Sequence, residues 1–117
     1  MSEETNRKKL NTAKKAVASI LSKAGYKIEL TSNNIYCLDA YRHSEHRIIA
    51  VGIKEILKTI KFKEQIKRLE KLPNPAPNVI TKEIWIRGDE EHGFRQYYFK
   101  QEYWENEDFD KVNIFEN

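Results

Sequence analysis

Apolar residues recur every three or four positions between residues 7 and 24, which is the spacing of an amphipathic helix. The apolar stripe consists of Leu10, Ala13, Val17, Ile20, Leu21 and Ala24. Gly25 follows directly and is a typical C-terminal helix stop. The opposite side has six bases and no acid: Arg7, Lys8, Lys9, Lys14, Lys15 and Lys23. The pattern therefore predicts a helix with one apolar and one strongly basic face.

Three strands are predicted after this helix. Residues 26–31 alternate polar and apolar, and a turn cluster at 32–34 separates them from a second apolar stretch at 35–41. The third stretch, 46–54, contains the run Ile48-Ile49-Ala50-Val51 followed by Ile53. A continuous apolar run of this kind suits a strand that is buried on both faces.

A second helix is predicted from about Thr59 to Leu72, with Phe62, Ile66 and Leu69 as its inner stripe. Its start is open, because the residues before Thr59 also fit helical spacing. It ends at a loop with three prolines between residues 73 and 78, which neither a helix nor a strand accommodates well. Residues 79–87 and 94–102 are expected to form the fourth and fifth strands, joined by a turn at 88–93.

The predicted order is α-β-β-β-α-β-β, in one domain over residues 1–102 followed by an acidic C-terminal tail, 103–117, that is expected to be loosely held. The connection from the third strand through the second helix to the fourth is long enough for parallel pairing. The fold class is therefore expected to be α/β, with a mixed central sheet flanked by helices.

Composition narrows the setting of this domain. The chain has 117 residues and a single cysteine, Cys37, which excludes an internal disulfide and favours a reducing compartment. No apolar run reaches the length of a membrane span. We therefore expect a cytoplasmic protein without a membrane partner.

Charge is distributed unevenly along the chain. Residues 102–117 hold six acids and one base, a net of −5, so the total of +3 leaves +8 for the rest. Such an asymmetry favours a polyanionic partner for the body, although an ordinary solvated surface with an acidic tail is the alternative. If nucleic acid binds, the predicted phosphate contacts are Arg7, Lys8, Lys9, Lys14, Lys15, Lys61 and Lys63.

The second half of the chain carries a resemblance to a known family. After the second helix come the prolines of 73–77, then Lys82-Glu83-Ile84-Trp85-Ile86 and His92-Gly93-Phe94. Together with the element order, these residues resemble small archaeal and viral members of the PD-(D/E)xK nuclease superfamily, which includes restriction enzymes and Holliday-junction resolvases. The resemblance implies a restriction-endonuclease-like core, DNA rather than RNA as partner, and a homodimer.

The family's catalytic motif is incomplete in this sequence. In the family an Asp on the second strand and a Glu-x-Lys pair on the third hold Mg²⁺ and orient the attacking water. One register places Asp39 and Lys54 at the Asp and Lys positions, with Gly52 in place of the Glu. A second register, shifted by two residues, places Cys37, Ala50 and Gly52 at the three positions. The Glu is absent in both.

The resemblance therefore implies Asp39 as metal ligand and Lys54 as the water-orienting base, with Mg²⁺ bound only if the protein is active. Glu29 and Glu45 are the candidate replacements for the missing acid. The structural alternative is that Asp39 lies near a strand end and pairs with Lys54 or a turn residue.

Two functions remain open on this sequence. The first is a nucleic-acid-binding, nuclease-like domain with residual magnesium-dependent DNA cleavage. The second is a catalytically dead nuclease scaffold that acts as a protein-interaction module. The aromatic strand with Tyr97, Tyr98 and Phe99 fits either, because aromatics can stack on bases or form core and interface.

Overall fold

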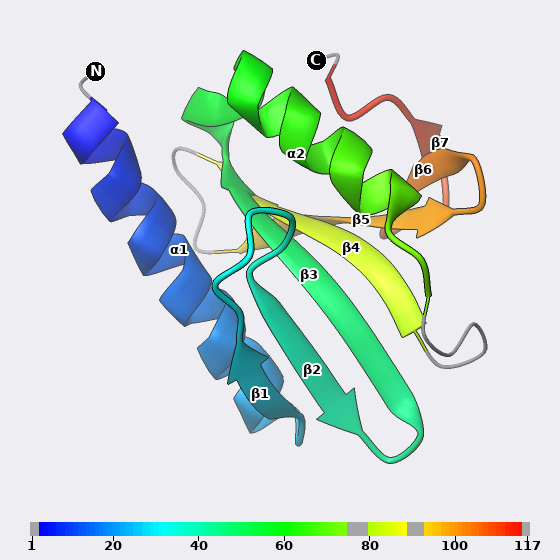
Figure 1. The fold of residues 1–117 in the computed structure, drawn as a ribbon. Coiled ribbons are helices and arrows are strands. Elements are labelled where there is room, and N and C mark those ends of the chain that lie inside the picture. Colours follow the sequence, from blue (N-terminus) through cyan, green and yellow to red (C-terminus); the bar gives the residue numbers. More distant parts are fainter. Residues whose placement is uncertain (1–2, 75–79, 89–92, 116–117) are drawn as a thin grey trace.

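The computed structural model describes residues 3–74, 80–88 and 93–115. It contains a seven-stranded sheet with one helix on each face (Figure 1). The elements are α1 (Glu3–Lys23), β1 (Lys27–Leu30), β2 (Leu38–Arg42), β3 (Glu45–Ile53), the 3-10 turn η1 (Lys54–Ile56), α2 (Ile60–Lys71), β4 (Ile80–Arg87), β5 (Phe94–Lys100), β6 (Tyr103–Asn106) and β7 (Lys111–Val112). The α/β class and the predicted order up to β5 are confirmed.

The seven strands lie in the sheet in the same order as in the chain. All neighbours are antiparallel except β3 and β4, which pair in parallel from His46 opposite Ile80 to Ile53 opposite Arg87. The predicted parallel crossover through α2 is therefore confirmed, and the sheet is mixed.

The two faces of β3 supply the two halves of the hydrophobic core. Ile49, Val51 and Ile53 pack against α1, in a cluster with Ala13, Val17, Leu21 and Trp85. Ile48 and Ala50 pack against α2, in a cluster with Phe62, Ile66 and Leu69. The continuous apolar run of β3 thus reflects burial on both faces, as the sequence predicts.

The second strand begins later than predicted. Ile35 and Tyr36 fit a strand pattern, but their backbone N–H groups donate to Asn33 Oδ1 at 2.7 and 3.0 Å. A side-chain acceptor of this kind holds the chain in a local turn and competes with strand pairing. As a result β2 begins only at Leu38.

The prediction of a loosely held C-terminal tail is wrong for the part that the structure describes. β6 and β7 continue the sheet, and Trp104 and Ile114 are 5% and 3% exposed. Trp104 Nε1 donates to Glu70 Oε2 of α2 at 2.7 Å. The apolar pattern did not predict this strand, because only Trp104 of the four β6 residues is buried and acidic residues surround it in the sequence.

Several predicted features lie outside the described residues. They are Pro75 and Pro77 of the proline-rich loop, Val79 at the predicted start of the fourth strand, and His92 in the following turn. Within the described residues, neither helix combines the length and apolar character that a bilayer span requires.

The sheet and α2 approach each other closely at Gly52. A Cβ atom at this position would lie 2.8 and 2.9 Å from Cζ and Cε1 of Phe62. Because the Phe62 ring is buried in the core and is not a flexible chain end, any side chain at residue 52 must displace it.

We expect Gly52→Ala to lower the free energy of unfolding by about 1–3 kcal/mol, because the added methyl group overpacks this contact. The measurement is urea unfolding followed by fluorescence. Gly93→Ala is the matched control, since a Cβ there meets nothing within 4 Å. Adding Phe62→Leu to Gly52→Ala should cost less than the sum of the two single changes, and strict additivity would contradict this account.

Candidate functional site

Asp39 lies on β2, on the sheet face that α2 partly covers, and it is already engaged. Its Oδ1 atom is 2.8 Å from His46 Nε2, and the Tyr36 hydroxyl lies 3.3 Å from each carboxylate oxygen. The imidazole of His46 stacks on the Tyr41 ring with centroids 4.4 Å apart. Asp39 is thus part of a half-buried cluster of one acid, one histidine and two tyrosines.

Lys54 is not part of that cluster. Asp39 lies opposite Ile48 in the ladder between β2 and β3, while Lys54 follows the last residue of β3. Six residues separate Ile48 from Lys54, or roughly 20 Å at about 3.3 Å per residue. The structure therefore does not bring Asp39 and Lys54 together, and Asp39 pairs with His46 instead.

The second register does not assemble a site either. Ala50 and Gly52 are buried beneath α2, and Phe62 occupies the space above Gly52. Cys37 packs against the α1 side of the core, where burial raises the pKa of its thiol. Cys37 and Asp39 therefore lie on different faces of the sheet, although they are two residues apart, because Cys37 precedes β2 and does not follow its alternation.

The two candidate replacement acids lie in different places. Glu29 is directly opposite Asp39 in the ladder between β1 and β2. Glu45 lies in the β2–β3 hairpin, where it pairs with Arg42 at 2.9 Å and accepts from the Tyr26 hydroxyl at 3.2 Å. Of the two, only Glu29 is a neighbour of Asp39.

These residues do not fit a resident magnesium ion. In the described part of the chain, no three His, Cys, Asp or Glu side chains converge as a metal site would require. Asp39 already accepts hydrogen bonds from its neighbours, and a Mg²⁺ ion needs several convergent oxygen ligands.

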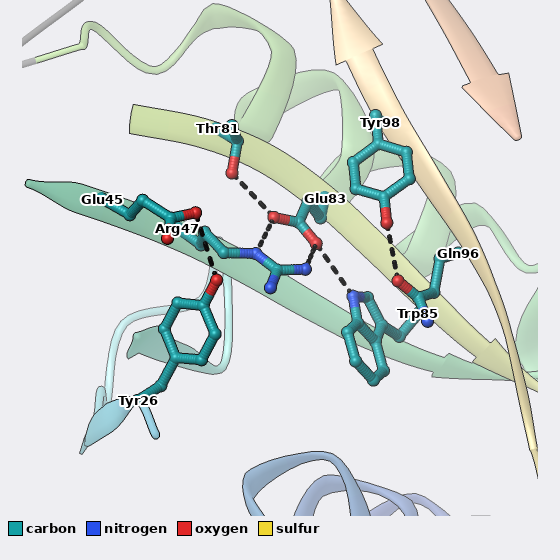
Figure 2. Close-up of polar contacts among 8 residues, drawn as sticks. All are labelled: Tyr26, Glu45, Arg47, Thr81, Glu83, Trp85, Gln96 and Tyr98. Atoms are coloured by element: carbon teal, nitrogen blue, oxygen red, sulfur yellow. Dashed lines mark hydrogen bonds and ion pairs between the residues drawn. The ribbon is translucent and has the colours of Figure 1, made fainter. Parts of the chain in front are cut away.

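A different polar cluster, drawn in Figure 2, lies on the opposite face of the sheet, the side on which Trp85 and α1 pack. Arg47 of β3 forms a two-pronged ion pair with Glu83 of β4 through Nε and Nη2. Glu83 is 0% exposed, and Arg47 is 16% exposed. Thr81 Oγ1 and Trp85 Nε1 also donate to the carboxylate, at 2.7 and 3.1 Å. All the hydrogen-bonding capacity of this buried acid is thus directed at protein donors.

Aromatic rings surround this ion pair. The Arg47 guanidinium lies 5.2 Å from the Tyr26 ring centroid and 5.9 Å from that of Trp85. On β5, the Tyr98 hydroxyl donates to Gln96 Oε1 at 2.7 Å. Stacking of this kind favours the charged form of an arginine at low exposure.

The charge states follow from these contacts. Burial by itself would lower the pKa of Arg47, but the hydrogen bonds and the charge of Glu83 outweigh it and raise that pKa above its ordinary value. Burial, together with the negative charge of Glu83, raises the pKa of Tyr98. At neutral pH Arg47 is therefore charged and Tyr98 is a neutral phenol.

A pocket of about 400 Å³ opens beside the cluster at the start of β3 and β4. Its lining consists of Ser44, Glu45, His46, Arg47, Ile80, Thr81, Glu83 and Tyr98. Its size is within the range of small-ligand sites. Since Arg47 and Glu83 satisfy each other, the lining of the pocket offers a ligand the hydroxyl-bearing residues Ser44, Thr81 and Tyr98, together with Glu45 and His46.

Sequence reasoning missed this cluster, although a signal was present. Arg47 and Glu83 are charged residues next to apolar runs, and the connection between their two strands was predicted to be long enough for parallel pairing. Their diagonal placement, with Arg47 opposite Thr81 and Glu83 two residues further, depends on a register that only the structure gives.

The predicted phosphate-binding residues divide between the two faces. Arg7, Lys8 and Lys15 are exposed on α1. Lys9 is paired with Glu55 at 2.6 Å. Lys61 is exposed on α2, and Lys63 lies 5.7 Å from the Phe115 ring. Because the two helices cover opposite faces of the sheet, these residues do not form one continuous surface.

No protein-family model and no curated protein matches this sequence.

We expect Arg47→Met to lower the free energy of unfolding by about 3–5 kcal/mol, because it leaves the Glu83 carboxylate buried without its counter-charge. In a double-mutant cycle measured by denaturant unfolding, Arg47→Met combined with Glu83→Leu should cost clearly less than the sum of the single changes. Arg42→Met is the control: its partner Glu45 is 48% exposed, so its loss should stay below about 1 kcal/mol. Equal losses for both arginines would contradict this account.

Proposed function

We propose that the protein is a nucleic-acid-binding domain of the restriction-endonuclease-like type, and that α1 is its principal contact. The observation that carries the proposal is the exposed side of α1, where Arg7, Lys8, Lys15 and Lys23 stand and the helix has no acid between Arg7 and Lys23. Lys8 and Lys15 are seven residues apart, so they lie on one stripe about two turns long. Such a stripe neutralises phosphates without reading sequence.

The restriction-endonuclease-like assignment is supported by the strand–helix–strand crossover from β3 through α2 to β4 and by the similarity of residues 72–94 to that family. On this assignment DNA is the favoured partner. The site geometry supports binding more than cleavage, because Asp39 and Lys54 are far apart and the core fills the position of the missing Glu.

A protein-interaction module is the second candidate function. It is favoured by the open half of the α1 face, where Tyr98 of β5 and Tyr103 of β6 are half-exposed on neighbouring strands. Salt distinguishes the candidates, because phosphate binding weakens steeply as salt rises and an aromatic contact does not.

Reversing two charges on α1 tests the first candidate. We expect Lys8→Glu with Lys15→Glu to weaken binding to duplex or single-stranded DNA at least tenfold. The slope of log K against log salt should also fall by about 2, one for each lost phosphate contact. Fluorescence anisotropy across a salt series gives both quantities.

The matched control is Lys67→Glu with Arg68→Glu, which reverses two exposed bases of α2 on the other face of the sheet. This variant should retain most of the affinity and the slope. Equal effects of the two variants would show that binding follows net charge alone and would remove α1 from its proposed role.

A cleavage assay tests whether the protein binds DNA without cutting it. With Mg²⁺ or Mn²⁺ and branched, duplex or single-stranded DNA, we expect salt-sensitive binding without metal-dependent cleavage. If cleavage occurs and Asp39→Ala abolishes it, the protein is a nuclease. Its catalytic site would then contain Asp39 without Lys54.

A further inference from the structure

Two exposed apolar side chains, Phe109 and Ile60, have neighbours of opposite charge. Among the described residues, the exposed large apolar side chains are Ile20 at 43%, Leu30 at 76%, Ile60 at 75% and Phe109 at 72%. Phe109 lies between acids and Ile60 between bases, which makes their surroundings complementary.

Phe109 stands at the tip of the turn between β6 and β7. Asn106 Oδ1 accepts from the backbone N–H groups of Asp108 and Asp110 at 2.9 Å each, and Phe109 N donates to Asn106 O at 2.8 Å. Phe109 has φ 68°, a left-handed conformation that costs energy for a bulky residue. The turn therefore holds a phenylalanine ring in solvent against its backbone preference.

The flanks of Phe109 are acidic. Glu107, Asp108 and Asp110 are all exposed. Lys100 is the base near the ring, with its Nζ atom 6.0 Å from the centroid. We call residues 107–110 the acidic turn.

Ile60 is the first residue of α2, following the N-cap Thr59. Lys58 and Lys61 on either side of it are exposed, and Glu64 lies one turn further along the helix. We call residues 58–61 the basic patch. The charged residues that flank Ile60 in the sequence are thus basic, and those that flank Phe109 are acidic.

The two features cannot meet within one chain. Trp104 of β6 bonds to Glu70 near the end of α2, ten residues or about 15 Å of helix from Ile60. Figure 1 likewise shows the β6–β7 turn far from the start of α2. A contact between them therefore requires two molecules.

We infer that the acidic turn of one molecule docks on the basic patch of a second copy, with Phe109 packed against Ile60. This contact buries two apolar side chains that are otherwise exposed to solvent, and it pairs acids with bases around them. Two such contacts made reciprocally close a dimer, which would place two α1 helices in one assembly. Because the contact is small, the association is weak and depends on concentration.

Sedimentation velocity and equilibrium from micromolar to millimolar protein test this contact. The wild type should show a rise in average mass above 13.9 kDa with concentration. Phe109→Ser should weaken the association at least tenfold. Leu30→Ser is the matched control: it removes an equally exposed apolar side chain on the edge strand β1 and should leave the association unchanged.

A charge-swap experiment tests the pairing itself. One variant carries Glu107→Lys with Asp108→Lys, and the other carries Lys58→Glu with Lys61→Glu. Each alone places like charges together and should be monomeric, while a 1:1 mixture should associate again. Circular dichroism and thermal unfolding check that each variant is folded.

Three results would overturn the inference: a wild type that stays at 13.9 kDa at every concentration, an association that Phe109→Ser leaves intact, or folded charge-swap variants that fail to associate when mixed. Loss of association through Leu30→Ser would locate the contact at the β1 edge instead. None of these results bears on nucleic-acid binding by α1, which is tested separately.

Discussion

The parallel ladder between β3 and β4 is the contact on which the rest of the structure depends. Among the described strands, these two are the one pair of neighbours that runs in the same direction, so the chain between them must return along a face of the sheet. That crossing contains α2, and it covers one face of β3 while α1 covers the other. The two halves of the core therefore lie on opposite faces of β3 and its neighbour β4, which explains why β3 has apolar residues on both sides.

The same ladder sets the chemistry of the two faces. On the α2 side the sheet and helix approach so closely at Gly52 that an added side chain would have to displace the Phe62 ring. On the α1 side, the diagonal between Arg47 and Glu83 holds a buried ion pair. A buried pair of this kind adds little net stability, but it penalises any shifted register that would separate the two charges. We interpret it as a device for strand register more than for catalysis.

The hydrophobic pattern predicted most of the fold and little of the candidate site. Helical and strand periodicity located α1, α2 and the strands through β5, because each buries a regular stripe. It misplaced the start of β2, where Asn33 captures the backbone, and missed β6, where one tryptophan among polar residues provides all the burial. The site depends on which residues face each other across strands. Asp39 was singled out as an acid in an apolar strand and it is half-buried, but its partner is His46, which no spacing along the chain could identify.

The strand order has a consequence for how the chain folds. Because each strand pairs with its neighbour in sequence, most of the ladders close short loops, and loop closure is the entropic cost that slows sheet formation. The exception is the pairing of β3 with β4, because the long connection between these strands, which contains α2, must first be in position. Folding would then begin from two antiparallel units, β1–β3 and β4–β6. The slow step would be the pairing of β3 with β4, which brings Arg47 of one unit to Glu83 of the other.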